Sequence, residues 1–270
     1  MSPLASLGFS GGPSGSGIVA TGGTISSYIN GKYKCHFFNT NGTFAISSNP
    51  NNEMFTVVIV GGGGSGGGGG YVAGTYRWSG AGGASGSFDI NSHWFGTYQV
   101  DVVVGGSTGN SSVTYNGNTS TAYGGPSGTS NYPNNNFPPM PAPGIPQSGN
   151  ADIGTYTNQA TLNITGNGGR AQAGANGIQG QSVNHAALFA AGLYSGFGGV
   201  GARGWDAYNN SPGLYNSGNG AAGGQSAGAT GYTAAGYGCG GGGGGAPSTN
   251  NSYSSGGAGS GGGVWIMYRA

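Results

Sequence analysis

Charge is what this sequence has least of: only 4% of its 270 residues are Asp, Glu, Lys or Arg, against about 25% in typical soluble domains. The formal net charge is +1, so no electrostatic attraction to phosphates is expected and nucleic acid is not an expected partner. Intrinsic disorder usually combines low hydrophobicity with high net charge, and the second condition is missing. A low-complexity chain that aggregates is the alternative on composition alone.

Long apolar runs and amphipathic helices are also missing. The longest apolar run, residues 57–60 with its flanks, is far below the ~20 residues that span a bilayer, so we expect no membrane insertion. The first eight residues, MSPLASLG, have neither the basic nor the long apolar region of a signal peptide. The best helical stretch, residues 183–193, is short and rich in Ala and Gly, so we expect little or no α-helix.

Groups that carry catalysis or bind metals are few and scattered. Cys35 and Cys239 could form one bridge, but their distant positions and the missing signal peptide favour two buried thiols. Nothing resembles the spacing of metal ligands. His36 and His93 lie among aromatic residues, as packing or surface groups do, and the five carboxylates stand apart, unlike a glycosidase pair. The GxGxxG pattern at 61–66 is followed by no helix. We expect no enzyme, cofactor or metal.

Glycine, by contrast, makes up 67 of the residues and gathers in runs. Glycine loses more backbone entropy on folding than any other residue, so a glycine run becomes ordered only where backbones pack closely. The runs at 61–64 and 66–70 follow the apolar segment 55–60, and the run at 261–263 precedes the apolar segment 264–268. We therefore expect residues 57–60 and 264–267 to be core strands, close together in space.

In places glycine recurs at every third position, as in residues 174–180 and 198–204. A period of three is typical of an extended left-handed chain with three residues per turn. Collagen would need a longer repeat with Pro-rich filling. We expect polyglycine II segments at 61–70, 174–180, 198–204 and 238–245, packed side by side and joined by backbone hydrogen bonds.

Aromatic and β-branched residues predict further strands at 28–38, 44–46, 71–78, 87–90 and 97–104. Asn41-Gly42 predicts a hairpin between the first two, and Asn116-Gly117 predicts another tight turn. Asp101 occupies a solvent-facing position in an alternating strand. The expected fold class is mostly β with polyglycine II helices: a short β-sheet framework packed with a layered glycine-rich slab.

The chain divides into three parts by composition. Residues 1–20, rich in Ser, Gly and Pro, predict an extended N-terminal attachment segment outside the globular domain. Residues 21–270 predict the glycine-rich domain itself. Within it, residues at about 124–160 include a Pro-rich stretch, which predicts a projecting loop because Pro fixes φ and donates no backbone hydrogen bond.

The motifs resemble the glycine-rich domains of tailed-phage fibre proteins. The likeness rests on the segment TGGTI from Thr21, the strand-to-polyglycine segment VVIVGGGG from Val57, the segment GTYQVDVVVGG from Gly96 and the ending GGGVWIMYR. It spans about residues 21–269. In the related T-even-type long-tail-fibre adhesins, polyglycine II helices are bundled in layers and loops at their far end hold the receptor contacts. This chain departs from them in lacking their large N-terminal attachment domain and in its Pro-rich residues 130–146.

The resemblance implies a virion protein, assembled in the host cytoplasm, that binds a host-surface receptor of protein or glycan. Residues 1–20 would join it to other fibre, baseplate or capsid proteins, and a homo-oligomer is possible. Its contacts would come from aromatic residues interleaved with Asn and Ser, which suit adaptable recognition. The candidates are Tyr123, Tyr132, Phe137, Tyr194, Phe197, Trp205, Tyr208 and Tyr215.

Two alternatives stand beside this interpretation. The same aromatic residues could cover the ends of the glycine slab, and the protein could then be purely structural, as a head fibre, decoration or fibre shaft.

The other alternative is ice binding by a flat slab, which would need a regular triplet face. The breaks after Gly180 and Gly204 argue against one.

Overall fold

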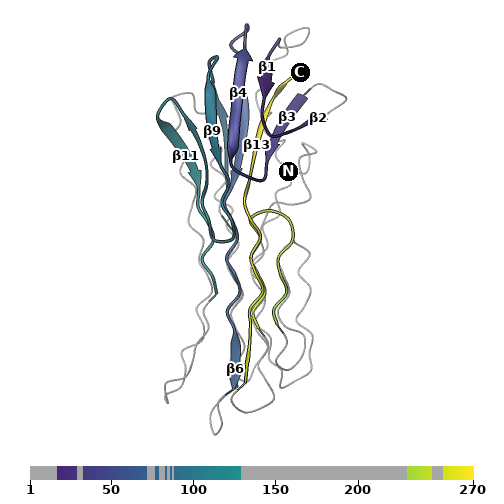
Figure 1. Ribbon diagram of the computed structural model, residues 1–270, viewed down its shortest axis with the longest axis vertical. Helices are drawn as coiled ribbons and strands as arrows, with labels where there is room; N and C mark the ends of the chain where they lie inside the picture. The colour runs from purple at the N-terminus through teal and green to yellow at the C-terminus, as the bar shows by residue number, and fades with distance from the viewer. Residues whose placement is uncertain are drawn as a thin grey trace, which may run out of the picture.

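A computed structural model describes residues 17–28, 33–71, 77–78, 83, 86, 88–128, 230–244 and 252–270. Within these ranges the chain forms thirteen β-strands and no helix. Every strand pairing is antiparallel. The strands gather mainly at one end of an elongated molecule, as Figure 1 shows. The prediction of a mostly β protein with little α-helix is confirmed for this part of the chain.

Two five-stranded sheets face each other as a β-sandwich in the upper half of Figure 1. The first sheet has the order β1 (Val19–Thr21), β4 (Gly42–Ser48), β9 (Gln99–Val103), β10 (Ser111–Tyr115) and β11 (Asn118–Ala122). The second has the order β2 (Thr24–Tyr28), β3 (Tyr33–Phe38), β13 (Gly263–Arg269), β5 (Phe55–Val60) and β8 (Phe88–His93).

The core lies between the two sheets and is filled by alternate residues of their strands. On β9, Val100 and Val102 are buried while Asp101 is exposed, as predicted. The facing sheet contributes large side chains from β5 and β13 to the same cluster. Burying a large apolar side chain contributes roughly 1.5–3 kcal/mol, so this cluster is the main source of stability in the sandwich.

The two apolar segments next to the glycine runs form the centre of the second sheet. In β5 all six residues are buried, and β5 pairs directly with β13. The prediction that both are core strands, close in space, is confirmed. The sheet face away from the core is covered as well: Trp265 stacks on Phe37 with ring centroids 4.7 Å apart and meets Tyr237 edge-on at 5.3 Å.

Of the two predicted turns, one is confirmed and one is wrong. Asn116 and Gly117, with φ of 48° and 79°, join β10 to β11 as a tight hairpin. Asn41 does not lie in a hairpin, because β3 and β4 belong to different sheets. Phe38 and Phe44 are both buried in the core, so the chain crosses from one layer to the other between them. The Asn41 side-chain oxygen accepts a hydrogen bond from the Val104 amide (2.8 Å), which fixes this crossing.

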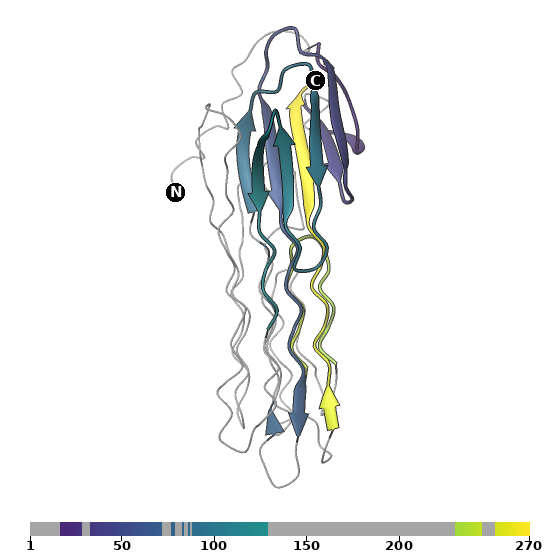
Figure 2. The same cartoon turned by 60° about the vertical axis from the view of Figure 1, so that its left-hand side comes forward.

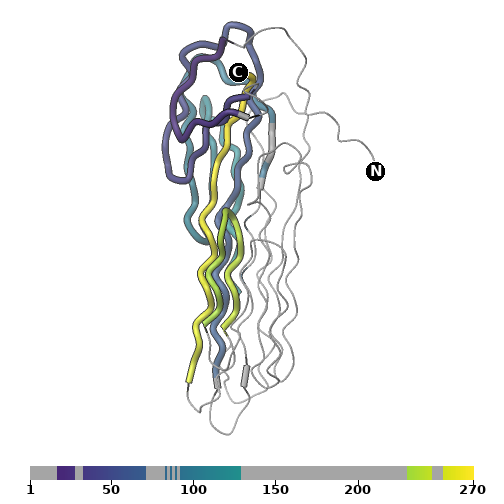
Figure 3. Tube along the Cα trace, turned by 90° about the vertical axis from the view of Figure 1, so that its right-hand side faces the viewer, coloured from purple at the N-terminus to yellow at the C-terminus, as the bar shows by residue number. Residues whose placement is uncertain are grey.

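Below the sandwich, glycine-rich segments run side by side along the long axis and form a stem (Figure 2). The central segment, residues 61–68, continues directly from β5. Residues 123–128 follow β11, and residues 255–262 lead into β13. The segment 238–244 lies beside 255–262, as Figure 3 shows.

Backbone hydrogen bonds join the central segment to these neighbours, and the bonds to any one neighbour recur every third residue. The bonds are Gly125 N to Gly62 O (2.7 Å), Gly128 N to Ser65 O (2.8 Å), Gly63 N to Ser260 O (2.8 Å), Gly66 N to Gly257 O (2.8 Å), Gly241 N to Gly64 O (2.8 Å) and Gly244 N to Gly67 O (2.9 Å). Each side of the segment thus faces a different neighbour, as expected for a chain with three residues per turn.

The hydrogen bonds fix the three-residue period but not the backbone dihedral angles, so polyglycine II itself stays a prediction. Ordered, closely packed glycine runs are found at 61–68 and 238–244. The predicted segments at 174–180 and 198–204, like the Pro-rich loop, lie outside the described residues.

Glycine is required in the stem because neighbouring backbones leave no room for a Cβ atom. A Cβ on Gly63 would overlap the Cys239 carbonyl, and one on Gly66 would overlap the Gly242 carbonyl. Ordering a glycine rather than an alanine costs about 0.5–1 kcal/mol. A backbone hydrogen bond contributes about 1 kcal/mol net, which is of the same size.

One side chain interrupts the central glycine run, and it has polar partners. Ser65 Oγ lies 3.3 Å from Ser107 Oγ, and the Ser65 amide donates to Ser127 Oγ (3.2 Å). Ser107 Oγ also donates to the Gly63 carbonyl (3.0 Å). These hydroxyl groups tie the central segment to its neighbours at a single height along the stem.

The predicted attachment segment overlaps the sandwich at its end. Ile18 is buried in the core, and β1 pairs with β4 from Val19 onward, with a bulge between Val19 and Ala20. Residues 1–16 lie outside the described residues, so the division at residue 20 stays a prediction for them.

A charge placed on the outer face of β5 should unfold the protein. Val58 is 1% exposed, and a lone buried carboxylate is strongly destabilising. Val58→Asp should therefore abolish cooperative thermal unfolding, followed by circular dichroism. Val103→Asp is the matched control, because Val103 is 44% exposed on β9. A normal melting temperature for Val58→Asp would contradict the assignment.

A methyl group added within the stem should destabilise it, and one added at the stem's open margin should not. For Gly66→Ala the Cβ would overlap the Gly242 carbonyl, and overpacking costs about 1–3 kcal/mol or more. A Cβ on Gly106 has nothing within 4 Å, so Gly106→Ala should change stability by less than about 0.5 kcal/mol. Chemical denaturation measures both. Equal stabilities for the two variants would show that the stem is not closely packed.

Candidate functional site

The stem ends in a small three-stranded sheet of β12 (Ser252–Ser254), β6 (Gly69–Tyr71) and β7 (Arg77–Trp78), in that order. The single strand predicted at 71–78 is therefore wrong. β6 pairs with β7 in antiparallel register, with Tyr71 opposite Arg77 and Gly70 opposite Trp78. Ser254 is buried, and its hydroxyl accepts a hydrogen bond from the Gly69 amide (3.1 Å), which fastens β12 to β6.

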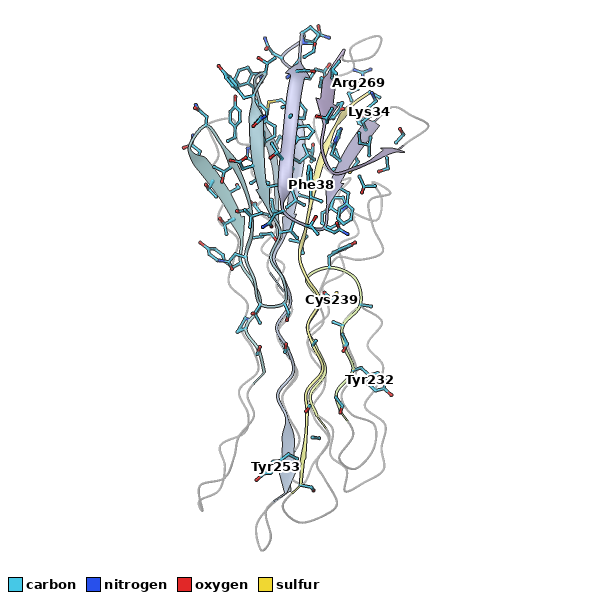
Figure 4. The ribbon with its side chains drawn as sticks, in the orientation of Figure 1. Lys34, Phe38, Tyr232, Cys239, Tyr253 and Arg269 are labelled. Carbon is cyan, nitrogen blue, oxygen red and sulfur yellow. The ribbon has the colours of Figure 1, made fainter. Side chains whose placement is uncertain are left out.

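Two exposed tyrosines lie on the stem, one of them near its tip. Tyr253, on β12, is 57% exposed and lies near the lower end of the molecule in Figure 4. Tyr232 is 51% exposed and lies partway along the stem. Tyr253 pairs in register with Gly70, which has no side chain to cover the ring. The composition of the sequence did not single out either residue; only their packing shows that they face solvent.

Of the eight predicted contact residues, the structure describes one. Tyr123 is half-buried and begins the stem segment that follows β11. Its carbonyl lies where a Cβ of Gly61 would have to be, so its backbone is packed at the junction of sandwich and stem. The other seven lie outside the described residues: Tyr132, Phe137, Tyr194, Phe197, Trp205, Tyr208 and Tyr215.

A second group of exposed aromatic residues lies at the opposite end, beyond the sandwich. Trp94 is 46% exposed and Tyr98 is 67% exposed, in the connection from β8 to β9. Gly96 lies between them, and its amide donates a hydrogen bond to Tyr115 Oη (2.9 Å). Residues 97–104 were assigned to a strand from sequence, but β9 begins only at Gln99. The signal that could have located this surface is the segment WFGTY itself, in which three aromatic residues surround a glycine.

His36 packs inside the sandwich core, where both of its ring nitrogens have polar neighbours. His36 is fully buried, with Nδ1 2.7 Å from the Gly22 carbonyl and Nε2 3.2 Å from Tyr268 Oη. Burial lowers the pKa of His36, the hydrogen bond to Gly22 opposes this shift, and the positive charge of Lys34 adds to it. Of the two roles expected for His36, a packing or a surface residue, the structure shows the first.

Both cysteines are free and buried, as predicted. Burial raises the pKa of the Cys35 thiol to about 12 and that of the Cys239 thiol to about 12. Both therefore stay protonated at neutral pH, and a thiol rather than a thiolate is a poor nucleophile. Cys239 packs at the top of the stem, where Figure 4 labels it.

Within the described ranges, no group of three His, Cys, Asp or Glu residues is arranged to hold a metal ion. Asp89, on β8, is buried and accepts a hydrogen bond from Ser120 Oγ (3.3 Å), which links the two sheets. No helix in the described part of the chain is long and apolar enough to cross a membrane.

A family model for a glycine-rich domain matches residues 39–269. The match covers the sandwich from the end of β3 and the whole of the described stem. No curated protein matches the chain. The exposed large side chains of the described surfaces include Trp94, Tyr98, Tyr232 and Tyr253.

Proposed function

The chain belongs to the glycine-rich domain family, and from that premise we propose that it is a virion fibre-type adhesin that binds a receptor on the host surface. It acts by binding and needs no cofactor. Its receptor is a protein or glycan of the cell surface, and aromatic and Asn-rich loops carried by the glycine stem make the contacts.

The observation that carries this proposal is the separation of the molecule's two ends. Val19 pairs with Ser48, and Arg269 pairs with Tyr33, both at the end of the sandwich remote from the stem. The three-stranded sheet lies at the other end (Figure 1). A protein held by its first residues would thus present the stem tip outward. Residues 1–20 would then join it to other virion proteins, with self-association as a further possibility.

The stem suits this display because backbone hydrogen bonds between its segments make it rigid. Its segments run in both directions, and each of residues 62–67 makes at least one backbone hydrogen bond to a neighbour. Loops held on such a support lose little entropy when a receptor binds, which favours affinity. Tyr and Trp side chains provide rigid contact area, and Asn and Ser provide adaptable hydrogen bonds.

Two aromatic residues of the Pro-rich segment should contribute to receptor binding. Replacing Tyr132 and Phe137 together by Ala should weaken adsorption of the purified protein to host bacteria, because large aromatic anchors carry much of an interface's energy. The melting temperature should stay nearly unchanged. Tyr232→Ala, on the side of the stem, is the matched control and should adsorb normally.

Two outcomes of that experiment would contradict the proposal. If the unmodified protein neither adsorbs to susceptible bacteria nor blocks their infection, the purely structural role in a head fibre, decoration or shaft would replace it. If the double variant loses thermal stability and adsorption together, the two aromatic residues belong to the folded core and other loops make the contacts.

A further inference from the structure

We propose that the end of the sandwich opposite the stem tip carries a separate binding surface for a neutral saccharide. This surface, here called the aromatic platform, consists of Trp94, Gly96, Tyr98 and Tyr115. It uses none of the residues assigned to receptor binding, so the inference goes beyond the proposed function. Tyr98 is the most exposed large hydrophobic side chain of the described residues, at 67%, and Trp94 is 46% exposed.

Hydrogen bonds to the surrounding backbone hold the platform in place. The Gly96 amide donates to Tyr115 Oη (2.9 Å), and the Tyr98 amide donates to the Gly96 carbonyl (2.9 Å). The Ile46 amide donates to the Tyr98 carbonyl (3.1 Å), which ties the platform to β4. The exposed rings are thus carried by an ordered backbone before any ligand arrives, and little entropy is lost on binding.

A fully buried ring supports the platform from below. Phe95 is 0% exposed and lies 5.1 Å from the Tyr115 ring, centroid to centroid. The Asn49 side-chain amide donates to the Phe95 carbonyl (3.4 Å) and to the Glu53 carbonyl (3.0 Å). Three connections, residues 49–54, 94–98 and 115–118, are therefore fastened to one another.

The packing around Gly96 favours a ligand that lies on the exposed side chains over one that inserts between them. A Cβ on Gly96 would lie 3.2 Å from Tyr115 Oη, 3.3 Å from the Tyr98 ring and 3.4 Å from the Trp94 ring. The space over the glycine is therefore already closed by the three aromatic side chains. A polyproline II peptide binds in a groove between aromatic side chains. A pyranose ring needs only an exposed aromatic face, on which its C–H groups can stack.

The surroundings of the platform are polar but almost uncharged. Glu53 is the one charged residue in the three connections, and it is half-buried. Exposed asparagines stand on the same connections: Asn51, Asn52, Asn116 and Asn118. Each side-chain amide can both donate to and accept from hydroxyl groups. Exposed aromatic side chains, with side-chain amides on neighbouring segments, match the apolar C–H groups and the hydroxyl groups of a neutral sugar.

Titration calorimetry with maltohexaose, cellohexaose and hexa-N-acetylchitohexaose tests the inference on the full-length protein. At least one should bind at millimolar or lower concentration. Trp94→Ala should weaken that binding about tenfold or more, the effect of losing one stacked ring. Tyr98→Ala, at the most exposed position, should weaken it several-fold and guards against misfolding of the first variant. Tyr253→Ala, an exposed aromatic at the stem tip, should bind the sugar unchanged.

Three results would overturn the inference. One is failure of all three oligosaccharides to bind at about 10 mM, a concentration that would nearly saturate a site of millimolar Kd. Another is sugar binding that neither Trp94→Ala nor Tyr98→Ala weakens. The last is binding of a proline decapeptide, lost in Trp94→Ala, where no sugar binds; the platform would then be a peptide site. Adsorption to host bacteria should be unchanged in Trp94→Ala, so failure here leaves the proposed function standing.

Discussion

Contact between backbones that lie too close for a Cβ atom is the interaction on which the stem depends. At Gly63 and Gly66 a neighbouring carbonyl occupies the volume that any other residue would need. The same closeness brings amides and carbonyls of different segments within 2.7–3.0 Å of one another. Each hydrogen bond contributes about as much as the extra entropy cost of ordering a glycine rather than an alanine. A methyl group would disrupt the close packing, and loss of a neighbouring segment would remove the hydrogen bonds. In either case we expect the glycine segment to become disordered.

A lattice of glycines cannot define its own register, because a shifted segment would make the same contacts. The sandwich supplies the missing information. Segment 61–68 continues β5, and segment 255–262 enters β13, so the pairing of these two strands sets the relative heights of the segments. Tyr237, packed on Phe37 and Trp265, holds a third segment against the sheet. Inside the stem, the hydroxyl groups of Ser107 and Ser127 contact Ser65 and fix the register of the central segment in the same way. A few side chains thus set the register of the segments, and the glycines make up most of the stem.

The parts of the fold that could be predicted from sequence are those determined by residues close together in the chain. The apolar run of β5, the positive-φ turn at Asn116-Gly117 and the alternation around Asp101 each follow from residues close in the chain. Long-range pairing was not visible. Asn41-Gly42 looks like a hairpin turn, but the burial of Phe38 and Phe44 between the sheets sends the chain across the sandwich. The aromatic platform was missed for a similar reason, since the pairing of β9 with β10 brings Tyr115 to Gly96 from another strand.

Hydrogen–deuterium exchange of the peptide covering residues 61–68, compared with the one covering β5, tests the close-packed stem most directly. Because the amides of Gly63 and Gly66 donate to carbonyls of another segment, they should open only when the whole domain unfolds. Their protection should then approach that of β5, whose residues are all buried. Such protection reports the free energy of opening. Complete exchange of the glycine peptide within seconds, while β5 remains protected, would contradict the account and reduce the stem to a flexible glycine chain.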